Sequence, residues 1–152
     1  MKKNQKGFTL VELLAVIVIL AVIILIAVNA IIPQMNKARK NAFIDEVAVY
    51  AQAAEKAYVA NQIDEGTTPT CYPVTGSGTN VLNGNYVKKA DDAYKGKVVL
   101  DADGNLSAIY LTNGKYMIVK ASGATAKPAS SDVVNHIASG TGAWASSYES
   151  CS

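Results

Sequence analysis

The sequence predicts an α+β fold in which one long N-terminal helix precedes a small antiparallel β-sheet. Three observations support this prediction: residues 8–32 are almost all apolar, a helical period follows as far as Asn61, and a period of two begins at Lys97. We expect a ladle shape, in which the N-terminal half of the helix protrudes and its second half packs on the sheet.

Composition narrows the class of protein. The chain has 152 residues, of which 50% are hydrophobic and 17% charged, and its formal net charge is +2. These values exclude a disordered chain, a collagen-like repeat and a polytopic membrane protein. The folded part has no basic stripe, so no specific nucleic-acid site is visible. The two cysteines lack the paired spacing of a zinc site.

The apolar run is preceded by a short basic segment. Lys2, Lys3 and Lys6 come just before a run of about 25 apolar residues, which as a helix would be roughly 37 Å long. That length spans a bilayer, and the lysines place the N-terminus in the cytoplasm. The run is too long for an ordinary secretory signal peptide and no small-residue cleavage site follows it. By hydropathy alone, the segment is a signal anchor.

A single carboxylate interrupts the N-terminal part of this run. Glu12 lies among leucines and valines, where a charge costs about 2.5–3.5 kcal/mol at mid-membrane and less near the interface. Such a charge calls for a partner. Cleavage after Gly7 would supply one, because Phe8 would then carry a positive amine about one helical turn away. The amine could belong to the same chain or to a neighbour in an assembly.

The run Lys6-Gly7-Phe8-Thr9-Leu10-Val11-Glu12 resembles the prepilin cleavage motif of type IV pilins and type II secretion pseudopilins. The resemblance implies that a prepilin peptidase cuts between Gly7 and Phe8 and methylates the new amino group of Phe8. It also implies that Glu12 is needed for assembly into a filament. The remaining motif positions, which we also assign to assembly, are Thr9, Leu10 and Val11.

The resemblance implies a structural subunit rather than an enzyme, with no catalytic residue, metal or cofactor. Its partners would be other copies in a helical homopolymer, the peptidase, the assembly platform and, before assembly, membrane lipid. The expected divisions are a leader (1–7), a hydrophobic helix (8–32), the amphipathic half of that helix (33–62) and a globular head (63–152). The filament would serve adhesion, twitching motility or DNA uptake outside the cell. A pseudopilin of a secretion or competence system is the main alternative, and a signal-anchored protein of another function the lesser one.

One feature departs from the family pattern. Many major pilins carry a glycine or proline midway along the apolar helix, whereas this chain has its first proline at Pro33. Proline removes one backbone hydrogen bond, so any kink or melted turn should centre just before Pro33. Asn29, a weak helix former, lies in the same stretch.

Beyond Pro33 the helical pattern becomes amphipathic and is expected to end between Asn61 and Gly66, ahead of Pro69. The apolar stripe is expected to lie against the sheet, and a face for a coiled-coil partner is the alternative. A basic cluster just past the apolar run is expected to be a solvated helix face or to meet Asp45 or Glu46 of a neighbour. The stripe comprises Ile44, Val47, Ala48, Ala51, Ala54 and Tyr58, and the cluster comprises Lys37, Arg39 and Lys40.

Three short β-branched and aromatic runs predict a three-stranded meander. They are Lys97–Leu100, Leu106–Leu111 and Lys115–Val119, separated by turn sequences at Asp101–Asn105 and Thr112–Gly114. The second turn contains Asn-Gly, which predicts a type I′ hairpin with positive φ at both residues.

The first turn also opens like a calcium-binding EF-hand loop, with Asp101-x-Asp103. However, the sixth position is Leu106 rather than glycine and the twelfth is Thr112 rather than glutamate. We therefore predict a hairpin turn and no metal site.

The two cysteines, Cys71 and Cys151, lie 80 positions apart at the two ends of the head. In an exported domain a disulfide is favoured over two free thiols, and it would resemble the disulfide-closed C-terminal loop of many type IV pilins. Two free cysteines are the alternative. The serine- and glycine-rich segment from Ala121 is expected to be surface loop, in which His136 and Trp144 are packing or surface residues.

Overall fold

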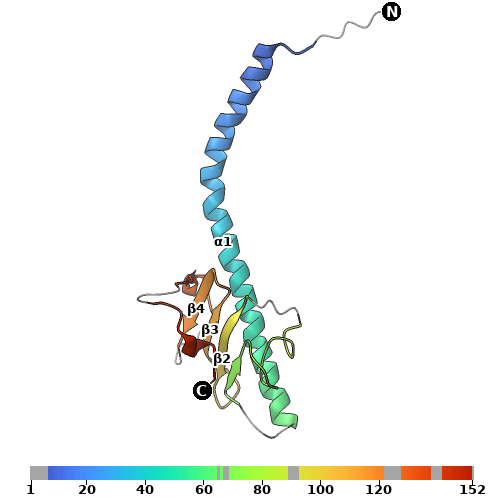
Figure 1. Ribbon diagram of the computed structural model, residues 1–152, viewed down its shortest axis with the longest axis vertical. Coiled ribbons are helices and arrows are strands. Elements are labelled where there is room, and N and C mark those ends of the chain that lie inside the picture. The colour runs from blue at the N-terminus through green and yellow to red at the C-terminus, as the bar shows by residue number, and fades with distance from the viewer. Residues whose placement is uncertain are drawn as a thin grey trace, which may run out of the picture. The chain divides into compact units, whose positions relative to one another are not determined.

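The α+β fold predicted from the sequence is confirmed. The computed structural model describes residues 7–64, 66, 69–88, 93–121, 128–137 and 142–151. One long helix is followed by a five-stranded sheet and two short 3₁₀ helices (Figure 1). In chain order the elements are α1 (Leu10–Asp64), β1 (Cys71–Pro73), β2 (Lys95–Leu100), β3 (Leu106–Thr112), β4 (Tyr116–Lys120), η1 (Ser130–Asp132), β5 (Val134–Asn135) and η2 (Ser146–Tyr148).

The chain divides into two compact units, residues 1–39 and 40–152. The described part of the first unit is the start of α1 and the residues just before it. The helix is unbroken at Pro33, so the structure contains no melted turn there. Because proline has no N–H, the Asn29 carbonyl lacks its usual helical donor. The Asn29 side chain turns back and donates to the Leu25 carbonyl oxygen at 3.3 Å.

In the second unit, α1 packs one face against the sheet. The predicted stripe is largely correct, but Ala48 is exposed and Ile44 is only half-buried. The buried face instead begins at Phe43, and it also takes in Tyr50 and Ala57. The centre of the buried face is therefore rotated slightly around the helix axis from the predicted stripe. The position of the sheet, and not the helix alone, determines which side of the helix is buried.

The sheet has the order β1-β2-β3-β4-β5, with every neighbouring pair antiparallel. Its three central strands are those predicted from the sequence, each with slightly shifted ends. The two edge strands were not predicted. At the end of β1, the Leu82 N–H donates to the Pro73 carbonyl oxygen at 3.0 Å, and just beyond the strand the Asn83 N–H donates to that of Val74 at 3.1 Å.

The turn between β2 and β3 is a hairpin turn, as predicted. One carboxylate oxygen of Asp101 accepts the backbone N–H groups of Asp103 at 3.0 Å and Asn105 at 2.8 Å. These hydrogen bonds, led by that from Asn105, hold the pKa of Asp101 below its usual value. The carboxylate therefore serves to close its own turn.

The turn between β3 and β4 differs from the predicted type I′ geometry. Gly114 has a φ of +79°, but no non-glycine residue in the described chain has a positive φ, so Asn113 does not adopt the second positive value. Instead, the Asn113 side-chain oxygen accepts the N–H groups of Lys115 at 3.1 Å and Tyr116 at 2.9 Å. These two hydrogen bonds to the Asn113 side chain stabilise the turn without a positive φ at Asn113.

Tyr58 joins the helix to the β2–β3 hairpin. Its hydroxyl donates to the Ala102 carbonyl oxygen at 2.6 Å. A Cβ atom at Gly104 would lie 2.8 Å from the Tyr58 ring, so the glycine leaves room for the ring. The hairpin is thus fixed to α1 by both packing and a hydrogen bond.

The C-terminal segment lies over the face of the sheet that points away from α1. Cys71 and Cys151 form a disulfide with their Cα atoms 5.7 Å apart. The Tyr148 ring stacks on Tyr110 of β3 at 4.7 Å between centroids. Lys97 Nζ donates to the Ser150 carbonyl oxygen at 2.8 Å. Three separate contacts therefore hold this segment on the sheet.

Candidate functional site at the N-terminus

The predicted assembly residue Glu12 lies in the first turn of α1, where it forms a capping box with Thr9. The Thr9 N–H and hydroxyl both donate to Glu12 Oε2, at 2.8 and 2.9 Å. In return, the Glu12 N–H donates to the Thr9 hydroxyl oxygen at 3.3 Å. Two of the unpaired N–H groups at the start of the helix are satisfied in this way.

The capping role of Thr9 was not predicted, although the sequence contains its signal. Thr-x-x-Glu before an apolar run is the pattern of a capping box. The partner predicted for Glu12, an amine on Phe8 after cleavage, does not exist in the uncleaved chain. In that chain the carboxylate instead accepts two hydrogen bonds, from the backbone N–H and the hydroxyl of Thr9.

The predicted cleavage position lies just outside the helix. Gly7, Phe8 and Thr9 precede the first helical residue, and the Phe8 side chain is 89% exposed. A Cβ atom on Gly7 would meet nothing within 4 Å. The predicted leader residues Lys2, Lys3 and Lys6 lie outside the described residues. The bond between Gly7 and Phe8 is therefore in non-helical chain that a protease can reach.

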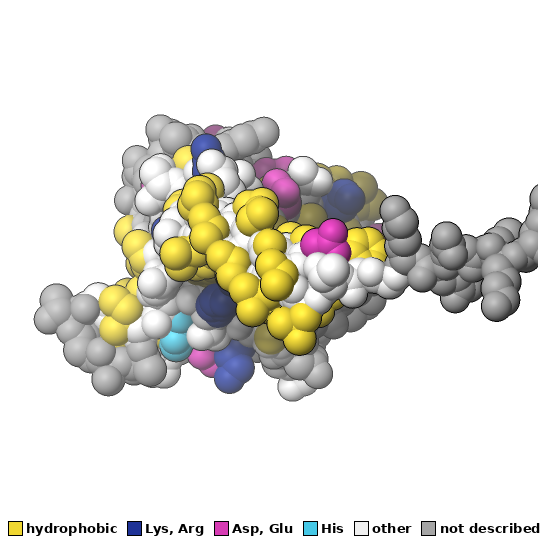
Figure 2. Space-filling view, turned by 90° about the horizontal axis from the view of Figure 1, so that it is seen from above, with side chains coloured by type: hydrophobic (Ala, Val, Ile, Leu, Met, Phe, Trp, Pro, Cys, Tyr) yellow, Lys and Arg dark blue, Asp and Glu magenta, His cyan; other side chains and the backbone are white. Residues whose placement is uncertain are grey.

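The first 23 helical residues present an apolar surface all the way round. From Leu10 to Ile32 every large apolar side chain is at least 45% exposed, and Figure 2, viewed from above, shows hydrophobic side chains covering the part of the helix nearest the viewer. By length and composition alone, α1 could cross a membrane. Leu10 and Val11, the other two predicted assembly residues, belong to this surface. Such an extent of exposed apolar surface requires either lipid or protein to cover it.

The basic residues beyond the apolar run have two different environments. Lys37 and Arg39 are exposed. Lys40 is half-buried, and its Nζ donates to the Val133 carbonyl oxygen at 3.3 Å. The sequence grouped these three residues together, but only the first two present free charge to the surroundings of the helix.

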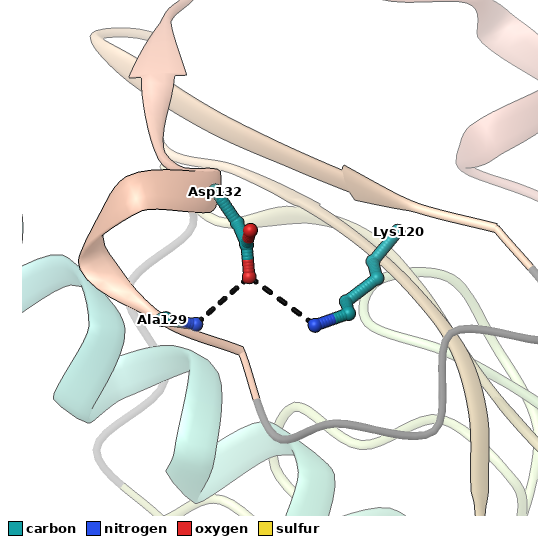
Figure 3. Close-up of polar contacts among 3 residues, drawn as sticks. All are labelled: Lys120, Ala129 and Asp132. Atoms are coloured by element: carbon teal, nitrogen blue, oxygen red, sulfur yellow. Dashed lines mark hydrogen bonds and ion pairs between the residues drawn. The ribbon is translucent and has the colours of Figure 1, made fainter.

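The carboxylate of Asp132 in the head has a structural role. Asp132 Oδ2 accepts the Ala129 N–H at 2.9 Å and lies 3.2 Å from Lys120 Nζ, as Figure 3 shows. The backbone hydrogen bond from Ala129, followed by the lysine, holds the pKa of Asp132 below its usual value. This contact joins the end of β4 to η1. Within the described ranges, no three histidine, cysteine or acidic side chains gather as metal ligands would.

His136 and Trp144 pack against each other, with ring centroids 6.3 Å apart. The Trp144 ring also meets Tyr148 edge-on, and its indole N–H donates to Glu149 Oε1 at 2.9 Å. Both residues therefore stabilise the C-terminal segment. The residues predicted to take part in processing and assembly all lie in the N-terminal segment.

Comparison with known proteins points to that same segment. The family model described as "Prokaryotic N-terminal methylation motif" matches residues 2–28, which include the predicted cleavage site, the capping box and most of the apolar run. Neither the comparison with curated proteins nor that with solved structures finds a significant match. The chain therefore carries the N-terminal methylation motif that is the prepilin signature of type IV pilins and pseudopilins.

Proposed function

We propose that this chain is the structural subunit of a type IV pilus filament. A prepilin peptidase removes residues 1–7 and methylates the amino group of Phe8. The mature subunit waits in the membrane, with α1 as its single span, and then polymerises through that helix into an extracellular filament. The observation that carries the proposal is the methylation motif set directly before a long apolar helix.

The environment of the motif supports the processing step. A peptidase must bind its substrate in an extended form, and the chain at Gly7 and Phe8 is neither helical nor covered by other described residues. The capping box starts the helix at Leu10, two residues after the bond to be cut. Cleavage would therefore leave the helix intact.

The polymerisation step is supported by the apolar surface and by Glu12. In a filament, neighbouring helices would cover the exposed apolar side chains of residues 10–32. The Phe8 amine of one subunit would pair with Glu12 of another, because a misplaced subunit would leave both charges unpaired. Thr9 would hold the carboxylate in place until that pairing occurs.

The head favours a pilin over a pseudopilin. The disulfide between Cys71 and Cys151 closes almost the whole head into one loop, with a sequence separation of 80. Such a covalent closure suits a subunit that stays exposed outside the cell. A pseudopilin of a secretion or competence system is the second candidate, supported by the same N-terminal motif.

The test is an intact mass with N-terminal fragment ions, measured on sheared cell-surface material and separately on membranes. We expect a chain that begins at methylated Phe8 in the sheared fraction. The same species confined to membranes would favour the pseudopilin. A chain still beginning at Met1, in cells with an active prepilin peptidase, would overturn the proposal.

The role of Glu12 is tested by Glu12→Ala, with Glu55→Ala as the matched control, because both carboxylates are exposed on α1. We expect Glu12→Ala subunits to be processed but to give at least about tenfold less sheared filament, a difference equivalent to roughly 1.4 kcal/mol. Glu55→Ala should assemble normally. Wild-type amounts of filament from Glu12→Ala would show that the pairing is not required.

A further inference from the structure

Two exposed cations follow the apolar part of α1 without an acidic partner. Lys37 and Arg39 are both exposed, and neither forms an ion pair with any described residue. No aspartate or glutamate occurs between Glu12 and Asp45, so the sequence places no acidic residue near them on the helix. Lys40 differs, because its ammonium group is engaged by the Val133 carbonyl oxygen.

The position of these cations along the helix matches the thickness of a bilayer. At 1.5 Å per residue, the apolar helical segment from Leu10 to Ile32 is about 35 Å long, enough to cross a hydrocarbon core of about 30 Å. Lys37 and Arg39 lie about 40 and 44 Å from Leu10 along the helix axis, and a bilayer with its headgroups is about 40–45 Å thick. With Leu10 at one headgroup layer, Lys37 and Arg39 reach the other.

The two side chains point to opposite sides of the helix. Residues two positions apart are separated by about 200° around the axis and by only about 3 Å along it. Lys37 and Arg39 therefore lie at nearly one depth while facing in different directions. A layer of negative charges surrounding the helix would contact both side chains at once, whereas an acidic patch on one neighbouring protein would contact only one of them.

We propose that Lys37 and Arg39 bind the phosphate groups of anionic lipid headgroups in the outer leaflet and so fix the depth of α1 in the membrane before assembly. This inference rests on the proposed function in taking α1 as a membrane span. Cleavage removes Lys2, Lys3 and Lys6, so in the mature subunit these two residues become the nearest basic side chains to the apolar segment. The arginine suits a bidentate contact with phosphate and the lysine a point contact.

Extraction from the membrane into a filament would then require these contacts to break. Each basic residue near an anionic membrane surface contributes about 1 kcal/mol, a factor of about five in affinity. Two such contacts hold the subunit at its depth, and salt would weaken them because they are exposed.

The experiment uses the uncleaved full-length chain in mixed micelles with equal amounts of phosphatidylglycerol and phosphatidylcholine. Native mass spectrometry counts the lipids retained by each protein. The variant is Lys37→Gln/Arg39→Gln. The control is Lys56→Gln/Lys88→Gln, which removes the same charge from two exposed lysines of the second unit. Circular dichroism verifies that both variants are folded.

We expect the wild-type chain to retain phosphatidylglycerol preferentially, the variant to lose roughly 25-fold of that preference, and the control to change less than about twofold. An equal fall in the control would make the effect one of net charge and overturn the proposal. A variant that keeps the wild-type lipid preference would overturn it too. Neither result depends on cleavage, so the mass measurement at Phe8 tests the proposed function separately.

Discussion

Gly96, in the middle of the sheet, provides a sharp test of the packing described above. The residue is buried in β2 and has a φ of +139°, a conformation that few residues other than glycine adopt. A Cβ atom there would lie 2.0 Å from the Tyr110 carbonyl oxygen and 3.0 Å from the Leu111 Cα atom. Both of these atoms belong to the backbone of β3, so no side-chain rotation can relieve the clash.

The expected loss combines two effects. Backbone strain at such a φ costs roughly 1–3 kcal/mol, and overpacking a buried site costs typically about 1–3 kcal/mol. We therefore expect Gly96→Ala to destabilise the head by about 2–6 kcal/mol. At about 4 °C for each kcal/mol, the melting midpoint should fall by about 8–24 °C.

The assay is thermal unfolding of the full chain in detergent, followed by near-ultraviolet circular dichroism of the head. Gly114→Ala is the matched control, because Gly114 also has a positive φ but a Cβ atom there would meet nothing within 4 Å. Gly114→Ala introduces backbone strain but no clash, so it should destabilise the head by about 1–2 kcal/mol. Its melting midpoint should therefore fall by roughly 4–8 °C. Midpoints of the two variants within about 3 °C of each other would refute the close approach of β2 and β3 at Gly96.

Three further predictions concern contacts within the head. Tyr58→Phe removes the hydroxyl that donates to the Ala102 carbonyl oxygen, and the melting midpoint should fall by the equivalent of about 1 kcal/mol; an unchanged midpoint would argue against this bond. Asp132 has a pKa below its ordinary value of 3.8, so its stabilisation is present above that pH and is lost as the pH falls through the lower folded-state pKa. Asp132→Asn should therefore melt lower than wild type at neutral pH and approach it in acid, whereas parallel pH profiles would contradict the assignment. Reduction of the disulfide should destabilise the head by up to about 4–5 kcal/mol, and Cys71→Ala/Cys151→Ala should melt with the reduced wild type if the bond itself is responsible.

The helix and the three central strands could be predicted because their signals are local. Each central strand has at least five residues, enough for a period of two to appear in the sequence. β1 has three residues and β5 has two, which is too short for any period. These edge strands exist because a neighbouring strand supplies hydrogen-bond partners, and nothing in their own sequence specifies that neighbour.

The N-terminal methylation motif could be recognised in the sequence because its residues are contiguous. Gly7, Phe8 and Glu12 stand at fixed positions in one short motif. By contrast, the stacking of Tyr148 on Tyr110 joins residues 38 positions apart and has no local signal. The exposure of Ala48 was likewise hidden, because helical spacing defines a stripe whose borders depend on the element packed against it.

The way in which the sheet ends has a consequence for solubility. An uncovered strand edge pairs readily with the edge of another molecule, and this hazard grows with local concentration. In the proposed filament, many identical heads would lie close together. β1 has only three residues and its Pro73 carbonyl oxygen already accepts the Leu82 N–H, while β5 offers only two residues for pairing. We therefore expect heads released from sheared filaments to stay dispersed instead of joining into larger sheets.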